Sequence, residues 1–331
     1  MYQFFRDVSR VTDMAGLFED HADFNHPLAG WEIEQVTDLS NMFSGAKNFN
    51  QNIDSWHVGA VTSFSGMFRG AKAFDQPIDL WETENAKDLS EMFDLAESFN
   101  QDISAWHVGK VHNFEAMFRG AKAFDHDITE WDVEDADDLR EMFMGAESFN
   151  QPIGNWHVGT VTSFQGMFHG AAAFNQPLAK WEMESSLDKS RMFMNAVSFN
   201  QPIDTWSMKT VNNLSSMFNG AVSFNQPLRD WQATYMEDTS LMFANSGFNQ
   251  PIPNWELDQV KSIAGMFYNA TNFNQDLCRW DNNVPRGVAF VEDGELEGLA
   301  EGIFRGSGCP NQNNPVSVTE GPWCHTCEGD K

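Results

Sequence analysis

The chain has 331 residues, 41% of them hydrophobic, and carries 48 acidic against 20 basic residues for a formal net charge of −28. Such a charge repels a nucleic-acid backbone or an anionic membrane surface at long range and attracts cations and basic partners, which excludes nucleic acid as an expected partner. No apolar run reaches the ~18 residues that a membrane-spanning helix needs, so the sequence predicts no membrane span.

The first residues lack the charged and apolar regions of a secretory signal. Residues 11–18 already follow the repeat pattern described next. We therefore expect any export leader to lie upstream of this sequence.

One 25-residue pattern fills most of the chain. In step with its tryptophans come a Met-Phe pair, as at Met67-Phe68, and a Phe-Asn-Gln segment such as residues 49–51. A repeat this short cannot bury its own hydrophobic residues, so about eleven copies are expected to stack. The tryptophans recur every 25 residues, with one deletion, at Trp31, Trp56, Trp81, Trp106, Trp131, Trp156, Trp181, Trp206, Trp231, Trp255 and Trp280.

Two periodicities follow one another within each repeat. Apolar residues at steps of three and four predict a short helix over residues 61–71. The alternation of Trp156 and Val158 with His157 and Gly159 predicts a strand with one buried face. The sequence thus predicts an α/β solenoid of about eleven 25-residue strand–helix units, with one parallel β-sheet, over residues 1–280.

Stacking in register would make equivalent residues of successive repeats neighbours. The residue after each tryptophan alternates between an acid and a histidine, which is favourable because like charges side by side repel. Charge complementarity between repeats is the favoured interpretation of this column, and a row of metal ligands or a pH-sensitive face is the alternative. The column consists of Glu32, His57, Glu82, His107, Asp132, His157 and Glu182, and it is the candidate binding surface.

Two further columns alternate in sign. The residue after Met-Phe is Arg69, then Asp94, then Arg119. Three residues further along, a second series reads Lys72, Glu97, Lys122 and Glu147. The repeat therefore sits within a 50-residue super-period. Acidic residues elsewhere predict at most weak, diffuse divalent-cation binding, because no calcium-loop motif occurs.

All four cysteines lie near the C-terminus, where residues 281–331 are predicted to form a degenerate last repeat and a disulfide-bearing cap. The segment Ile303 to Cys309 mimics Met242 to Phe248, which would place Cys309 in the position of a buried Phe. Of the three possible connectivities we favour Cys278–Cys309 with Cys324–Cys327. A redox motif or half of a zinc site at Cys324-His325-Thr326-Cys327 is the less favoured alternative.

The sequence contains no catalytic signature. A nucleophile elbow, a phosphate loop, a dinucleotide fingerprint and a zinc-protease motif are all missing from it. We therefore expect a protein that is not an enzyme and needs no cofactor. Two N-glycosylation sequons, at Asn213 and Asn269, would permit modification in a secretory pathway.

The repeat that runs from Phe149-Asn150-Gln151 through Trp156 to Met167-Phe168 closely resembles the repeat of BspA-like surface proteins, first described in mycoplasma lipoproteins. The resemblance covers roughly residues 11–280. That family is similar to leucine-rich repeats, so the resemblance implies a leucine-rich-repeat-like solenoid. Its members are usually secreted or surface-exposed, and where a role is known it is adhesion or partner binding.

These observations favour a non-enzymatic extracellular or cell-surface protein that binds a protein or glycan through an extended acidic surface. A structural component of an extracellular coat, filament or matrix is the alternative, and an oligomer is compatible with both. A metal-binding or enzymatic protein that uses the histidine and acid column is a weaker hypothesis. A cap that stops stacking argues against head-to-tail growth at the C-terminal end.

Overall fold

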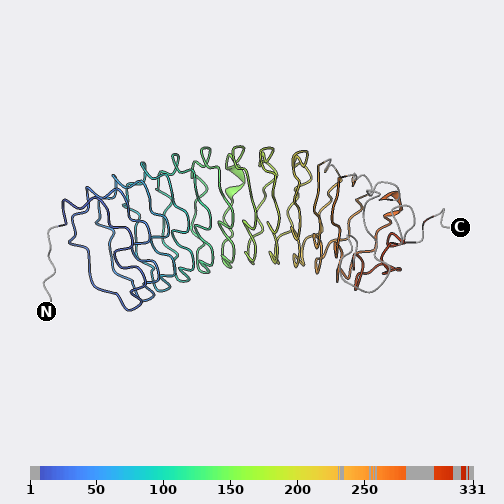
Figure 1. Cartoon of the computed structure of the whole chain (residues 1–331), viewed down its shortest axis with the longest axis horizontal. Coiled ribbons are helices and arrows are strands. Elements are labelled where there is room, and N and C mark those ends of the chain that lie inside the picture. Colours follow the sequence, from blue (N-terminus) through green and yellow to red (C-terminus); the bar gives the residue numbers. More distant parts are fainter. Residues whose placement is uncertain are drawn as a thin grey trace. The chain divides into compact units, whose positions relative to one another are not determined.

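The structure is a computed structural model that describes residues 8–229, 231, 235–252, 255, 257, 259–280, 302–315, 322–325 and 327. The chain divides into two compact units, residues 1–160 and 161–331, called here the N-terminal and the C-terminal unit. Figure 1 shows that each unit is a series of similar backbone coils lying side by side. Each coil corresponds to one sequence repeat.

The prediction of strand–helix units is wrong. Among the described residues the only helices are two short 3-10 turns, η1 (Ile153–Asn155) and η2 (Cys278–Trp280), and no extended strand forms. Neighbouring repeats are instead joined by isolated parallel β-bridges. The described part of the chain is therefore neither an α/β fold nor a leucine-rich-repeat-like solenoid with a parallel β-sheet, but a stack of turns.

Left-handed residues are the reason that the predicted helix is absent. Gly66 and Gly70 have φ of +62° and +67°, and the equivalent Glu91 and Leu95 have +54° and +57°. A right-handed helix cannot pass through such residues. Between them the chain makes tight turns, in which the Met67 N–H donates to the Phe64 carbonyl at 3.0 Å. Consecutive turns thus bring an apolar side chain inward every three or four residues, as a helix would.

The backbone N–H groups that do not close these turns bind the next repeat. Phe64, Gly66 and Phe68 donate to the carbonyls of Asp88, Ser90 and Met92 at 3.0, 2.8 and 2.9 Å. The bridges keep the same register along each unit. They join Asp13, Asp38, Ser63, Asp88, Asn113 and Asp138 in the N-terminal unit, and Ser163, Asp188, Asn213, Asp238 and Ser262 in the C-terminal unit. The predicted in-register stacking of equivalent residues is confirmed within each unit.

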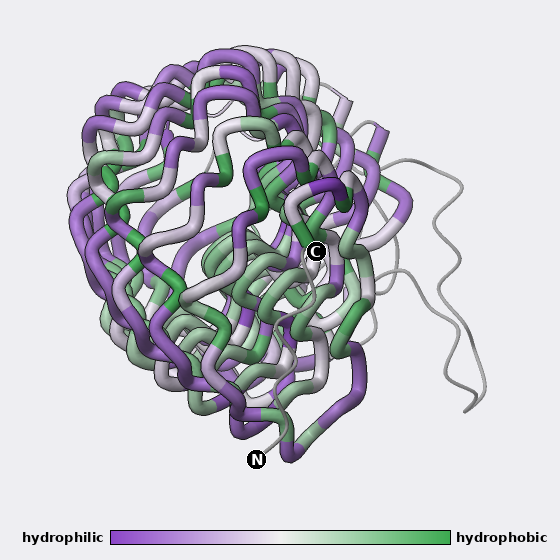
Figure 2. The backbone as a smooth tube through the Cα atoms, turned by 90° about the vertical axis from the view of Figure 1, so that its left-hand side faces the viewer, coloured by the Kyte–Doolittle hydropathy of each residue, from purple (hydrophilic) through white to green (hydrophobic). Residues whose placement is uncertain are grey.

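Aromatic columns form the core of the stack. In the N-terminal unit the ring centroids of Trp81 and Trp106 are 6.2 Å apart, and those of Trp106 and Trp131 are 6.4 Å apart. Each ring pair is nearly parallel, and all three indoles are almost fully buried. Figure 2 shows hydrophobic residues along the inner turns of the coils and hydrophilic residues along much of the outer rim. Stacking therefore supplies the burial that one repeat alone lacks.

Most of the buried indole N–H groups share one kind of partner. The Trp106 Nε1 donates to the carbonyl oxygen of Ile78 at 3.0 Å, and the Trp131 Nε1 donates to that of Ile103 at 3.1 Å. The same bond, from a tryptophan to a carbonyl of the preceding repeat, recurs in both units. A buried donor without a partner costs about 1–3 kcal/mol, so this bond favours the observed register.

The last repeat is recognisable although its sequence has decayed. The Phe267 N–H donates to the Ile303 carbonyl at 2.9 Å, and the Phe267 and Phe304 ring centroids are 5.8 Å apart. Cys309 is buried, and its N–H donates to the Ser307 hydroxyl just as the Phe248 N–H donates to Ser246. The predicted placement of Cys309 in a phenylalanine position is confirmed. Residues 281–301 lie outside the described part of the chain, so the boundary at 280/281 stays a prediction.

Candidate binding surface

The predicted column of acids and histidines lies on the surface. Its members in the N-terminal unit, and Glu182 in the C-terminal unit, are all exposed. The cause is local, because the residues directly before and after a member of the column point into the core. Trp106 and Val108 on either side of His107 are an example. The residue between them must then point outward.

The column's side chains interact weakly with one another. His57 Nδ1 lies 3.8 Å from Glu82 Oε1, with 67% and 50% of the two side chains exposed. Ion pairs this exposed contribute about 0–1 kcal/mol. Glu82 and Asp132 also lie over glycines of the preceding repeat, because a Cβ on Gly59 would be 3.4 Å from the Glu82 carboxylate and one on Gly109 would be 3.2 Å from that of Asp132. The 50-residue alternation thus pairs an acid with a glycine as well as with a histidine.

A metal centre finds no support at this column. Within the described ranges, no three His, Cys, Asp or Glu side chains converge in a way that could hold a metal ion. The alternative hypothesis of a row of metal ligands therefore lacks a candidate site among these residues.

The two other sign-alternating columns form ion pairs as predicted. Lys72 Nζ lies 2.6 Å from Glu97 Oε1, and Lys122 Nζ lies 3.5 Å from Glu147 Oε1. The hydrogen bond from Lys72, followed by its charge, lowers the pKa of Glu97 below the usual value. These pairs are exposed, so they contribute to the choice of register more than to stability.

Arg119 is the centre of a more buried network. Its guanidinium donates to both oxygens of Asp94, at 2.9 and 2.7 Å, and to Glu141 at 2.9 Å. Hydrogen bonding to Asp94, opposed by burial and helped by Glu141, raises the pKa of Arg119. Only 3% of the Asp94 side chain is exposed. Asp94 therefore depends on this arginine to compensate its buried charge.

We expect Arg119→Met to destabilise the N-terminal unit by about 3 kcal/mol, because it leaves the Asp94 carboxylate buried and unpaired. Methionine is a suitable replacement since Met144 and Met194 occupy the equivalent position in other repeats. The measurement is the free energy of unfolding in urea, with hydrogen exchange of residues 89–118 as the local probe.

The matched control is the double variant Arg119→Met with Asp94→Ser, since Ser44 occupies the equivalent position without a charge. It should recover most of the lost stability. A double variant no more stable than Arg119→Met alone would contradict the assignment of the cost to the unpaired carboxylate.

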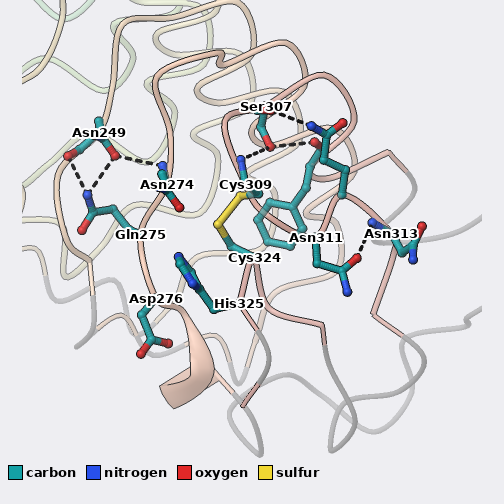
Figure 3. Close-up of a disulfide and its surroundings, with 12 residues drawn as sticks. Asn249, Asn274, Gln275, Asp276, Ser307, Cys309, Asn311, Asn313, Cys324 and His325 are labelled. Carbon is teal, nitrogen blue, oxygen red and sulfur yellow. Dashed lines mark hydrogen bonds between the residues drawn. A yellow bond between two sulfur atoms is a disulfide. The ribbon is translucent and has the colours of Figure 1, made fainter.

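An amide ladder runs along the Phe-Asn-Gln segments. The Asn50 Oδ1 accepts hydrogen bonds from the Asp75 backbone N–H and from the Gln76 Nε2, both at 3.0 Å. Asp75 in turn accepts the equivalent two bonds from Asn100 and Gln101. The pattern recurs in the C-terminal unit, for instance between Asn249 and both Asn274 and Gln275 (Figure 3). These asparagines act as scaffold, not as a binding site.

The two sequons differ in their surroundings. Asn213 is half-buried within the bridge column, and its side chain bonds to Asp188 at 3.3 Å and accepts from the Ser215 hydroxyl at 2.8 Å. Asn269 is exposed and bonds to Asn245 at 3.4 Å. A glycan would be attached to the Asn213 Nδ2 that donates to Asp188 and would disturb this half-buried contact, whereas the Asn269 side chain is exposed. Glycosylation at either residue stays a prediction.

The favoured cysteine pairing is wrong, although all four cysteines are in disulfides. Cys278 pairs with Cys327, and Cys309 pairs with Cys324, with Cα–Cα distances of 5.4 and 4.9 Å. Figure 3 shows the second of these beside Ser307. Because Cys324 and Cys327 each pair with a different partner, they form neither a redox pair with each other nor half of a zinc site.

The cap closes the aromatic core at the C-terminal end. Trp323 is fully buried, with its ring centroid 6.1 Å from that of Trp280 in an edge-on arrangement. Its carbonyl accepts from the Leu277 N–H at 3.4 Å, and the Cys324 carbonyl accepts from the Asn311 N–H at 3.1 Å. The cap thus covers the last stacked tryptophan, as a capping segment must.

Sequence reasoning missed one unusual core residue, Lys189, whose exposed fraction is zero. A signal existed: this lysine occupies the eighth position after a tryptophan, which other repeats fill with Leu, Phe, Ile or Thr.

None of the helices in the described residues is long and apolar enough to cross a membrane.

Comparison with known proteins places the chain in a family. No curated protein matches it. The family described as "Mycoplasma protein of unknown function, DUF285" matches residues 5–106, 55–146, 87–203, 127–231 and 192–289. These overlapping matches cover most of the sequence and coincide with the stacked repeats. The chain therefore belongs to this Mycoplasma repeat family, whose description assigns no function to its members.

Proposed function

We propose that this protein is a non-enzymatic extracellular or cell-surface repeat protein that binds a protein or glycan through the exposed column of acids and histidines. The observation that carries the proposal is the regular outward placement of Glu32, Glu82 and Asp132 along the N-terminal unit. Surface carboxylates at regular intervals offer a partner a repeated contact of one sign, which speeds and orients association with a cationic surface.

Two further observations support an extracellular address. Disulfides persist mainly in oxidising compartments, and all four cysteines of this chain are paired. The resemblance of the repeat to BspA-like surface proteins points the same way. No catalytic residue or cofactor is part of this proposal.

The test is a binding screen against arrayed glycans and extracellular-matrix proteins with two charge variants. Glu82→Gln with Asp132→Asn removes two of the four carboxylates of the column, whereas Glu97→Gln with Glu147→Gln removes two carboxylates of the ion-pair columns and leaves the same net charge. If the column binds the partner, only the first variant should lose affinity, by roughly tenfold or more at low salt.

Equal losses in the two variants would show that net charge alone drives binding and would overturn the proposal. Light scattering after size-exclusion chromatography distinguishes partner binding from a structural role. A monomer favours partner binding, and concentration-dependent growth favours an assembly.

A further inference from the structure

Lys189 is a cationic side chain in an otherwise apolar column. The flanking repeats of the C-terminal unit place Phe164 and Leu214 at the equivalent position, and both are fully buried. Lys189 is equally buried, with no exposed surface. Its ammonium group therefore lies where other repeats place hydrocarbon.

The polar groups around the amine are few. Lys189 Nζ donates to the Ser186 carbonyl at 3.0 Å and to the Met183 carbonyl at 3.3 Å. Ser186 is itself fully buried and occupies the position of Val161 and Val211 in the adjacent repeats. A serine in place of valine leaves room for the lysine's amine, so the two substitutions belong together. The pair of carbonyls satisfies two N–H groups but supplies no countercharge.

No carboxylate forms an ion pair with Lys189 within the described part of the chain. Asp188 is the charged group that acts on it, and its carboxylate is engaged elsewhere, accepting from the Ser190 N–H at 2.7 Å and from Asn213 Nδ2 at 3.3 Å. The flanking repeats contribute Phe164 and Leu214 to the column, and neither titrates. Burial therefore dominates over Asp188 and lowers the pKa of Lys189 to about 7.

The direction of the pH effect follows from the two states. In the unfolded chain a lysine titrates near ~10.4, so between about pH 7 and that value the unfolded state binds more protons than the folded state. Stability of the folded repeat must then rise with pH across this range. Below about pH 7 the amine is charged in both states, and the full cost of burying the charge is present.

We propose that the repeat from Trp181 to Thr205 is a pH-operated weak point of the stack, at which protonation of the buried Lys189 amine in mildly acidic solution favours local opening. Each repeat contacts only its neighbours, so an unfavourable charge in one repeat weakens the structure locally. The amine is hidden from solvent while the repeat is closed, and opening lets water solvate its charge. The inference is independent of the partner-binding proposal.

Hydrogen exchange of the full chain with intact disulfides, from pH 6 to pH 9, tests the proposal. After correction for intrinsic exchange rates, protection of amides in residues 183–199 should increase up to tenfold per pH unit above about pH 7, the limit for release of one proton. In Lys189→Leu, which restores the residue of the other repeats, this segment should be strongly protected at every pH.

Two further variants keep the test decisive. Lys189→Met, which retains a long unbranched side chain, should also abolish the pH slope if the leucine variant packs poorly. Lys180→Leu removes a nearby exposed lysine and should leave the slope unchanged. Protection that does not change with pH in the natural chain, or a slope that persists in both Lys189 variants, would overturn the proposal.

Discussion

Phe93→Ala is expected to destabilise the N-terminal unit by about 3–5 kcal/mol, because it opens a cavity in the middle of the aromatic core. The Phe93 side chain is fully buried, and its ring centroid lies 3.9 Å from that of Phe99 and 5.6 Å from those of Phe68 and Phe118. Neighbouring repeats hold these rings in place on both sides, so the site cannot collapse. Loss of hydrogen-exchange protection in residues 86–118 measures the effect.

Phe18→Ala is the matched control. Phe18 is the first described ring of the same column, stacked on Phe43 at 5.6 Å, and it is half-buried. In the described part of the chain a neighbouring repeat packs against only one side of Phe18. Its replacement should therefore lower the free energy of unfolding by roughly half as much as Phe93→Ala. Equal costs at the two positions would contradict a core built by stacking.

Removal of the Cys278–Cys327 disulfide, by changing both residues to serine, is expected to destabilise the cap by about 4 kcal/mol. The bond joins residues 49 apart, and closing a loop of that length removes this much entropy from the unfolded chain in the chain-entropy estimate. Urea unfolding, with hydrogen exchange of residues 302–315 as the local probe, measures the loss.

The second disulfide provides the comparison. Cys309–Cys324 spans 15 residues, so its removal should cost about 3 kcal/mol, less than the first. Peptide mapping without reduction checks the pairing itself. Recovery of a Cys278–Cys309 cross-link from the natural protein would refute the connectivity described here.

Stacking was predictable because the repeat is nearly exact in length. When every repeat has the same number of residues, equivalent positions must face one another, and the alternating charges at Lys72 and Glu97 are consistent with only that register. The same reasoning located Cys309 in the last repeat from its offset to Phe304.

Secondary structure was not predictable from hydrophobic spacing, because successive turns and a helix bring apolar residues inward at similar intervals. The deciding feature is the left-handed backbone at Glu91 and Leu95, which these two residue types do not reveal and which only the equivalent Gly66 and Gly70 indicate. Such residues are strained by about 1–2 kcal/mol each, and the hydrogen bonds to the next repeat hold them in place.

In the cap, too, the sequence predicted one feature and the tertiary structure decided another. The spacing of the cysteines left three connectivities open, and the structure pairs Cys278 with Cys327 and Cys309 with Cys324. The sequence by itself determined which residues stack and how their charges alternate, since these depend on repeat length, and which residues face outward, since this depends on the alternation of apolar and polar residues. The tertiary structure decided the backbone conformation and the disulfide pairing, because these depend on which groups in neighbouring repeats are left to satisfy one another.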